Sequence, residues 1–259
     1  MTVMKTLRRI VIACSIATFA VTASGDDDLA DDAMLLQHWA LQGDMQAQHT
    51  LGMMYLNGEL GIQSYDEARY WLSRSADQGH AGARTNLALL YLTGEGEVHD
   101  VEAGRTYLQQ AVSQHFAPAT FLMAYLYETG EILPRDYQLA GELYQEAANQ
   151  GNGSAQFHLA LMYRDGHGMS KNPQQAVYWL KKAAGQGVVS AEFQLGMHYL
   201  YGDGTGKDVL KGYGHLLQAS LHAGLKAMDS RELVSTSLTA EQIEDIQTQS
   251  GQWYGTEDH

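Results

Sequence analysis

Histidine is the side chain of this sequence best suited to bind a metal, and the chain contains 11 histidines. Histidine ligands for zinc are typically placed one helical turn apart, as in His-Glu-x2-His, so that both rings lie on one face. No His-x3-His or His-Glu-x2-His spacing occurs, and the pairs that could be imagined together are His158 with His167 or His198. We therefore expect isolated histidines that pack or face solvent, with no metal site and no cofactor.

Glycine-rich and acidic segments give no sign of catalysis either. The run from Gly94 to Glu97 looks like a phosphate loop, but Gly-x-Gly recurs in register at 166–168 and 202–204, which favours a repeated turn. There is no Gly-x-Ser-x-Gly motif and no dinucleotide fingerprint. Carboxylate pairs such as Glu241 and Glu244 fall in loops or on polar helix faces, where nothing perturbs their pKa for acid–base work. The sequence thus predicts a protein that is not an enzyme.

A period of 36 residues organises the rest of the chain. A period between 20 and 50 residues is typical of a solenoid, in which each repeat buries its apolar face against its neighbours. Five units run from 44 to 223, starting at Asp44, His80, Phe116, Asn152 and Val188. The residues that mark the period most clearly are Tyr55, Tyr91, Tyr127, Tyr163 and Tyr199, followed by Gly58, Gly94, Gly130, Gly166 and Gly202.

Each unit shows two amphipathic helical patterns, which predict a helix hairpin. In unit four, Ala155, Leu159 and Tyr163 share one face of the first helix, and Ala176 and Leu180 one face of the second. Small residues at 52, 88, 124, 160 and 196 should let the two helices approach closely, with the tyrosines filling the wider gap.

Loop residues predict where the helices end and begin. The glycines at 58 and its equivalents suit a left-handed residue after the first helix. A second glycine at 96, 168 and 204 should tighten the loop. Asp100, Asp136, Asn172, Asp208 and Ser64 suit the N-caps of the second helices. His115 replaces the glycine found at 79, 151 and 187, so we expect the main irregularity there.

The two ends of the chain read differently from the repeats. Lys5, Arg8, Arg9 and the apolar run from Ile10 to Val21 predict a signal peptide over 1–25, which contains the single cysteine, Cys14. Residues 26–43 match one second helix and predict a capping half-repeat, and 224–259 predict C-terminal capping helices and tail. After cleavage we expect no membrane insertion, and a stability that comes from packing without disulfides.

Composition limits the possible partners. The chain has 259 residues, 45% hydrophobic and 18% charged, which suits a packed protein. Its 30 acidic and 16 basic residues give a net charge of −14, which disfavours nucleic acid and anionic lipid. The apparent caps favour a monomer.

The pattern A-x3-L-G-x2-Y-x2-G-x-G, then D-x3-A-x2-W-L-x2-A-A-x-Q-G, resembles the Sel1-like repeat, most clearly over 155–187. The resemblance implies an all-α protein, a right-handed α-solenoid of antiparallel helix pairs with five full repeats and helical caps. It also implies an adaptor exported from a Gram-negative bacterium to the periplasm or beyond, in envelope signalling, secretion or host interaction. One branch, rich in paired cysteines that this chain lacks, is linked to cell-wall-like and β-lactam ligands.

By analogy with tetratricopeptide arrays, the first helices should line a concave face. Methionines and aromatics there would suit an extended peptide or an amphipathic helix. His49, Phe121, Phe157 and Phe193 share a further position, where we expect packing between units. The candidate partner-binding residues are Met53, Asn57, Leu89, Thr93, Tyr125, Thr129, Leu161, Asp165, Met197, His198 and Tyr201.

Two functions therefore compete. The first is a scaffold that binds a protein or peptide partner on its concave face. The alternative is a protein that binds or modifies peptidoglycan fragments, which sedimentation with purified peptidoglycan would distinguish. The five repeats have the same tyrosine but differ at the candidate partner-binding positions. Partner choice should therefore depend on the candidate positions.

Overall fold

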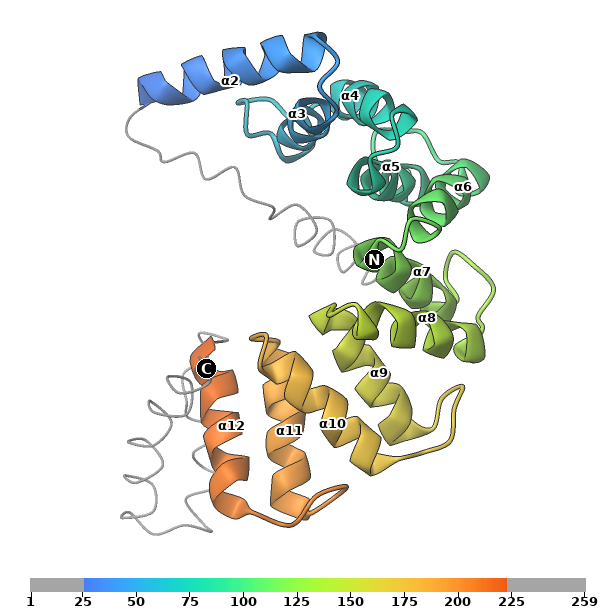
Figure 1. Ribbon diagram of the computed structural model, residues 1–259, viewed down its shortest axis with the longest axis vertical. Helices are drawn as coiled ribbons and strands as arrows, with labels where there is room; N and C mark the ends of the chain where they lie inside the picture. The colour runs from blue at the N-terminus through green and yellow to red at the C-terminus, as the bar shows by residue number, and fades with distance from the viewer. Residues whose placement is uncertain (1–25, 223–259) are drawn as a thin grey trace. The chain divides into compact units, whose positions relative to one another are not determined.

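The computed structural model describes residues 26–222, and side-chain exposure from residue 33 onward. The described part contains helices and no strand, which confirms the all-α fold (Figure 1). The expected signal peptide and C-terminal caps lie outside the described residues. The chain divides into two compact units, which meet in sequence between Arg135 and Asp136.

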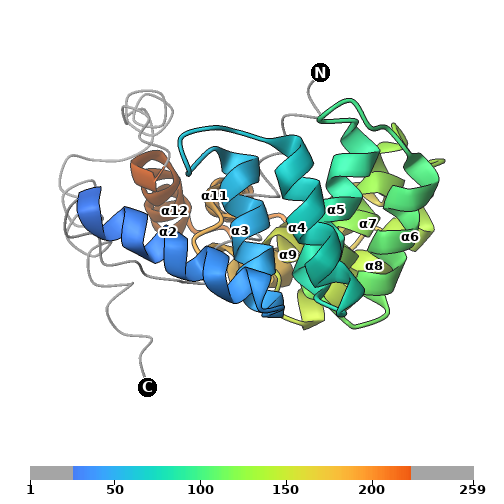
Figure 2. The same cartoon turned by 90° about the horizontal axis from the view of Figure 1, so that it is seen from above.

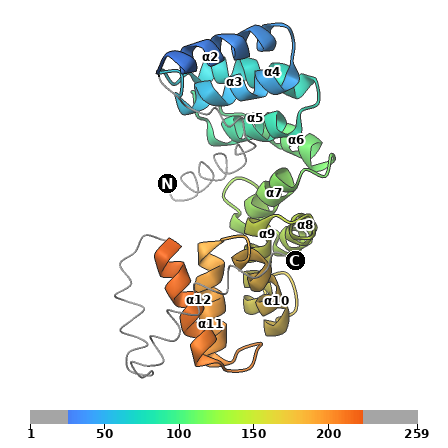
Figure 3. The same ribbon diagram turned by 60° about the vertical axis from the view of Figure 1, so that its left-hand side comes forward.

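The described part of the first unit is a succession of six helices. α2 packs on α3, α3 on α4, α4 on α5, α5 on α6 and α6 on α7. Figures 2 and 3 show the first of these helices, α2, α3 and α4, lying side by side. The helices are α2 (Asp26–Leu41), α3 (Met45–Asn57), α4 (Tyr65–Asp77), α5 (Ala81–Thr93), α6 (Val101–Val112) and α7 (Ala117–Thr129).

The second unit repeats this arrangement with five helices between residues 136 and 222. Each packs on the next, and α11 and α12 form a close antiparallel pair (Figure 1). Within each unit, hairpins stacked on hairpins build the predicted solenoid. The helices are α8 (Tyr137–Asn149), α9 (Gly153–Asp165), α10 (Pro173–Ala184), α11 (Val189–Tyr201) and α12 (Val209–His222).

The expected helix ends are confirmed. Each first helix, from α3 to α11, ends at a glycine with φ between 68° and 80°, a conformation that L side chains adopt at a cost. Each predicted N-cap side chain accepts a hydrogen bond from the backbone N–H three residues later. Asp100, for instance, accepts from the Ala103 amide at 3.0 Å. His115 has a φ of 56°, in the same left-handed region as Gly79, Gly151 and Gly187, so the backbone φ at this junction follows the other repeats and does not show the irregularity expected from the sequence.

Helix pairs approach closely at the small residues. A Cβ at Gly52 would lie 2.8 Å from Leu72 Cγ, so the close packing of α3 on α4 requires a residue without a side chain at position 52. Two of the repeated tyrosines stack on the second helix of their own hairpin: Tyr91 on Tyr107 with ring centroids 5.9 Å apart, and Tyr199 on His215 at 5.7 Å. These tyrosines are therefore structural, as the constancy of their spacing predicted.

The second loop glycine has a wider role than the sequence indicated. A Cβ at Gly168 would lie 2.1 Å from the carbonyl oxygen of Tyr137, at the start of α8, and one at Gly204 would lie 2.2 Å from that of Pro173. The glycine therefore lets the loop of one repeat lie directly against the second helix of the repeat before it.

Candidate functional site

In the first unit, most predicted partner-binding positions are buried. Met53, Leu89 and Tyr125 are packed into the core, and Thr93 and Thr129 are half-buried with their hydroxyls bonded to the carbonyls of Leu89 and Tyr125. Asn57 is the exposed member of this set; its amide donates to Glu59 at 2.7 Å. The first helices of this unit therefore offer little apolar surface to a partner.

A buried polar cluster joins α3 to α5 in this unit. Asn86 donates its side-chain amide to His49 Nε2 at 3.0 Å and to Met53 Sδ at 2.9 Å. The His49 ring packs on the His80 ring with centroids 4.4 Å apart, and His80 Nδ1 caps α5 through the Ala83 amide. The cluster thus ties the first helices of two neighbouring repeats together.

Burial sets the protonation of both rings. Burial, and then the neighbouring His80, lowers the pKa of His49 to about 4, and burial lowers the pKa of His80 as well. Both imidazoles are therefore neutral at pH 7, and a second proton on either would be opposed by the packing around it.

In the second unit, the same helix face is open. Phe193, Met197 and Tyr201 follow one another at i, i+4 and i+8 along α11, so they share one side of the helix. Phe193 is 47% exposed and Tyr201 70%, with Met197 half-buried between them. On α9, the half-buried Phe157 and Leu161 occupy the equivalent positions. We call these five residues the α9–α11 face.

Polar residues border the α9–α11 face. Arg164 donates to both carboxylate oxygens of Asp165, at 2.8 and 2.7 Å, and to Gln194 Oε1 at 2.9 Å. The hydrogen bonds from Arg164 lower the pKa of Asp165. This network joins α9 to α11 beside the apolar stripe and holds both helices in place.

His198, another predicted partner-binding residue, is buried and does not lie on the exposed α9–α11 face. Its side chain is buried, and Nδ1 donates to the carbonyl oxygen of Asp203 at 2.7 Å. Its contact stabilises the loop that follows α11, so the side chain does not contribute to the α9–α11 face.

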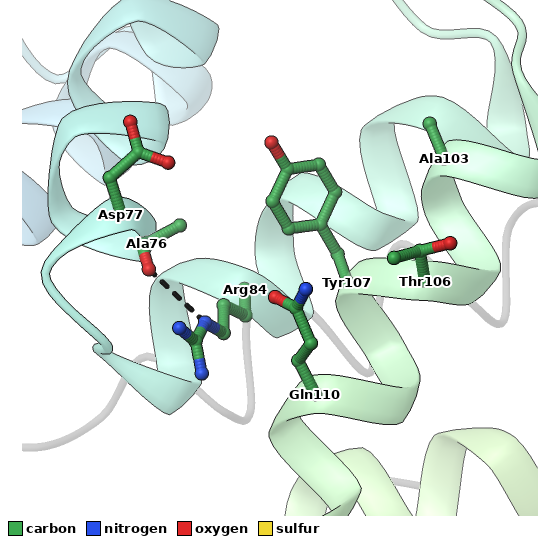
Figure 4. Close-up of a pocket in the computed structure, with 7 residues that line it drawn as sticks. All are labelled: Ala76, Asp77, Arg84, Ala103, Thr106, Tyr107 and Gln110. Atoms are coloured by element: carbon green, nitrogen blue, oxygen red, sulfur yellow. Dashed lines mark hydrogen bonds between the residues drawn. The ribbon is translucent and has the colours of Figure 1, made fainter.

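A pocket in the first unit was not anticipated from the sequence. It lies between α4, α5 and α6, with a volume of about 420 Å³ (Figure 4). Arg84, Tyr107 and Gln110 are its main polar side chains. Its sequence signal is a local departure from the repeat, with Thr106 standing where Tyr70 and Tyr178 stand in other units.

Residues 26–222 contain no group of three His, Cys, Asp or Glu side chains that could hold a metal ion. Within the same residues, no helix combines the length and apolar character needed to cross a bilayer.

A family model for the Sel1 repeat matches the chain five times in succession, over residues 46–80, 81–116, 117–152, 153–188 and 189–222. The chain belongs to the Sel1 repeat family. Sel1 repeat proteins generally mediate protein–protein interactions and form a family of scaffolds. A search among curated proteins found no match.

Solved bacterial structures share the fold. A Sel1 repeat protein from Oxalobacter formigenes is 29% identical, with a TM-score of 0.59, over 90% of this chain and 69% of its own. A protective antigen of uropathogenic Escherichia coli with this fold is 23% identical, with a TM-score of 0.52, over 96% of this chain. The chain spans 60% of that antigen's length, and this second likeness concerns the fold alone.

Proposed function

We propose that this Sel1 repeat chain is an exported, non-catalytic scaffold that binds an amphipathic helix of a partner protein on the α9–α11 face. The observation that carries the proposal is the exposed stripe of Phe193, Met197 and Tyr201 along a first helix. Export rests on the predicted signal peptide over 1–25.

The composition of the stripe supports a helix as the ligand. Aromatic side chains provide large contact area at a low cost in conformational entropy, and methionine adapts to varied shapes. Anchors spaced at i, i+4 and i+8 suit a partner helix whose apolar residues recur each turn. The Arg164–Asp165–Gln194 network would then form the polar rim of the interface.

The comparison between the two units supports the choice of this face. Phe121 on α7 occupies the same repeat position as Phe193, yet it is 4% exposed against 47%. The same residue type therefore packs inside the first unit and reaches solvent in the second. A partner that recognises this position has an accessible aromatic anchor on α11.

Site-specific photo-crosslinking tests the proposal. A benzophenone amino acid placed at 193 or 201 should crosslink a partner from the envelope of the native host, whereas one at Tyr178 on α10 should not. Tyr178 is the matched control because it is also 47% exposed but lies on a second helix. Mass spectrometry of the crosslinked peptide should identify an amphipathic segment.

A synthetic peptide of that segment then provides a quantitative test. Phe193→Ala and Tyr201→Ala should each weaken its binding about tenfold or more, since buried aromatic anchors dominate interface energies. Tyr178→Ala should bind like the parent protein. Equal crosslinking at 178 and 193, or unchanged affinity in both α11 variants, would contradict the proposal.

A further inference from the structure

The pocket between α4, α5 and α6 lies apart from the proposed interaction face in sequence and belongs to the first unit. Its sides come from the end of α4, the first turn of α5 and one face of α6. In Figure 4 the Tyr107 ring lies above Gln110 of α6, with Asp77 of α4 to its left and Arg84 of α5 beside Gln110. The 420 Å³ volume suits a small ligand or one or two residues of a chain.

Two small residues open this pocket in the second repeat. Thr106 replaces the tyrosine found at 70 and 178, and Ala103 replaces the longer Glu67, Gln175 and Lys211 of other repeats. Because the backbone pattern of the repeats is the same, removing two bulky side chains from one face of α6 leaves space. The pocket therefore lies where α6 carries two short side chains and the equivalent positions of α4 and α10 carry long ones.

Arg84 supplies a cation that other repeats lack. At its position Gln48 and Gln156 donate to a carbonyl of the preceding helix, and each also accepts a bond from the glutamine 30 residues later. Arg84 keeps the first contact, through Nε and the Ala76 carbonyl oxygen at 3.1 Å. Its two Nη groups have no hydrogen-bond or ion-pair partner among residues 26–222.

Further donors stand beside Arg84. The Tyr107 hydroxyl and the Gln110 amide have no hydrogen-bond partner within the described part of the chain. Stacking on Tyr91 at a 3° interplanar angle fixes the Tyr107 ring. Burial, then Tyr91 and Asp77, raises the pKa of Tyr107, so its hydroxyl stays protonated and can donate. Asp77 provides an acceptor near the hydroxyl end of the ring (Figure 4).

We propose that this pocket binds a ligand with a terminal carboxylate and a nearby N–H group, such as a free amino acid or the C-terminal residue of a peptide. The Arg84 guanidinium, pinned by its Nε contact, would take the carboxylate in its two-pronged geometry, helped by Gln110. The Tyr107 ring would cover the ligand's hydrocarbon part, and Asp77 would accept from its N–H. A dianion would be opposed by Asp77.

Titration with four probes tests whether the pocket binds a carboxylate. It also distinguishes a free amino acid from the C-terminal residue of a peptide. The probes are L-phenylalanine, its amide, N-acetyl-Gly-Phe with a free carboxylate, and N-acetyl-Gly-Phe amide. Binding is monitored by the NMR signal of the Arg84 Nε–H. Both carboxylates should bind in a saturable manner and shift that signal, and both amides should not. Binding of the acetylated dipeptide alone would assign a peptide terminus, and binding of the amino acid alone a free metabolite.

Variants of the same full chain complete the test. Arg84→Gln should weaken carboxylate binding about tenfold or more, because a charge-assisted pair is lost. Arg74→Gln removes an equal charge from the exposed side of α4 and should leave binding unchanged. Thr106→Tyr, which restores the residue of other repeats, should block binding while the circular dichroism melt stays that of a folded protein. Absence of saturable carboxylate binding to the parent, equal binding of the amides, or unchanged binding by the folded Thr106→Tyr variant would overturn the proposal.

Discussion

The side-chain amide of Asn86 on α5 donates to Nε2 of His49 on α3 at 3.0 Å, and this bond fixes the tautomer of a buried imidazole. An amide nitrogen cannot accept, so Nε2 must be unprotonated and the His49 proton must be on Nδ1. The Nδ1 atom is buried without a partner in the described structure. Charging the ring would place a proton on Nε2, break the bond from Asn86 and bury a cation.

Acid should therefore destabilise the first unit. His49 has a pKa of about 4 in the folded chain against 6.5 for an ordinary histidine, so between these values the unfolded chain binds more protons. The contribution of neutral His49 to the free energy of unfolding is fully present above pH 6.5 and is lost as the pH falls towards 4. We expect a loss on the order of 2 kcal/mol between pH 7 and pH 4.5, measured by urea unfolding.

The variant His49→Phe isolates this effect. Phenylalanine occupies the same repeat position at 121, 157 and 193, so it is a natural replacement. The slope of unfolding free energy with pH should become shallower in His49→Phe, whatever the change in absolute stability. His38→Gln, on the exposed side of α2, is the control and should keep the parent slope. Identical slopes in His49→Phe and the parent would refute the assignment.

Gly168→Ala tests the contact between neighbouring repeats. Two costs should add: the left-handed φ of 69°, worth about 1–2 kcal/mol, and the clash of the new Cβ with the Tyr137 carbonyl oxygen. Since that neighbour is backbone, the repeats must separate, which we expect to cost about 1–3 kcal/mol more. The measurement is the free energy of unfolding in urea.

Gly187→Ala separates the two costs. Gly187 has a similar φ of 76°, but a Cβ there would meet nothing within 4 Å. It should therefore show the conformational cost alone. If the two variants lose the same stability, the loop does not depend on close approach to α8.

The local elements of this fold could be predicted because local rules decide them. A left-handed residue at Gly58 or Gly166 and an N-cap at Asp100 or Asn172 depend on a few neighbouring residues, which the 36-residue period repeats. The helix hairpins followed from the same rules. At His115, which breaks a series of glycines, the sequence suggested an irregularity, but the residue adopts the same left-handed φ as those glycines.

The exposure of the candidate residues could not be predicted in the same way. Phe121 and Phe193 are equivalent in the repeat, yet one is buried and the other exposed. Burial of such a side chain depends on residues that another repeat places against it, as His80 does for His49. The sequence pattern of a repeat specifies the residues that its own hairpin needs. It does not determine the contacts between neighbouring repeats.

The same reasoning applies to the glutamine near the end of the second helices, present at 78, 114, 150 and 186. The motif marks Gln186, but its partner lies 30 residues earlier: Gln186 Nε2 donates to Gln156 Oε1 at 2.8 Å. Gln156 is buried and in turn donates to the Ala148 carbonyl oxygen at 3.1 Å. The pair thus connects three consecutive helices, α8, α9 and α10.

A double-mutant cycle on Gln156 and Gln186 should reveal this connection. Gln156→Met keeps the side-chain volume but removes one of two donors to the Ala148 carbonyl, which still accepts from the Gly151 N–H at 3.1 Å. We therefore expect a loss of about 0.5–1.5 kcal/mol in unfolding free energy. Gln186→Ala removes one partly buried hydrogen bond and should cost about 0.5–1.5 kcal/mol. Because both variants break the same bond, the double variant should lose less than the sum of the two. Gln174→Met, exposed on α10, is the control and should be neutral. Strict additivity would mean that the bond between Gln156 and Gln186 contributes nothing to the stability of the stack.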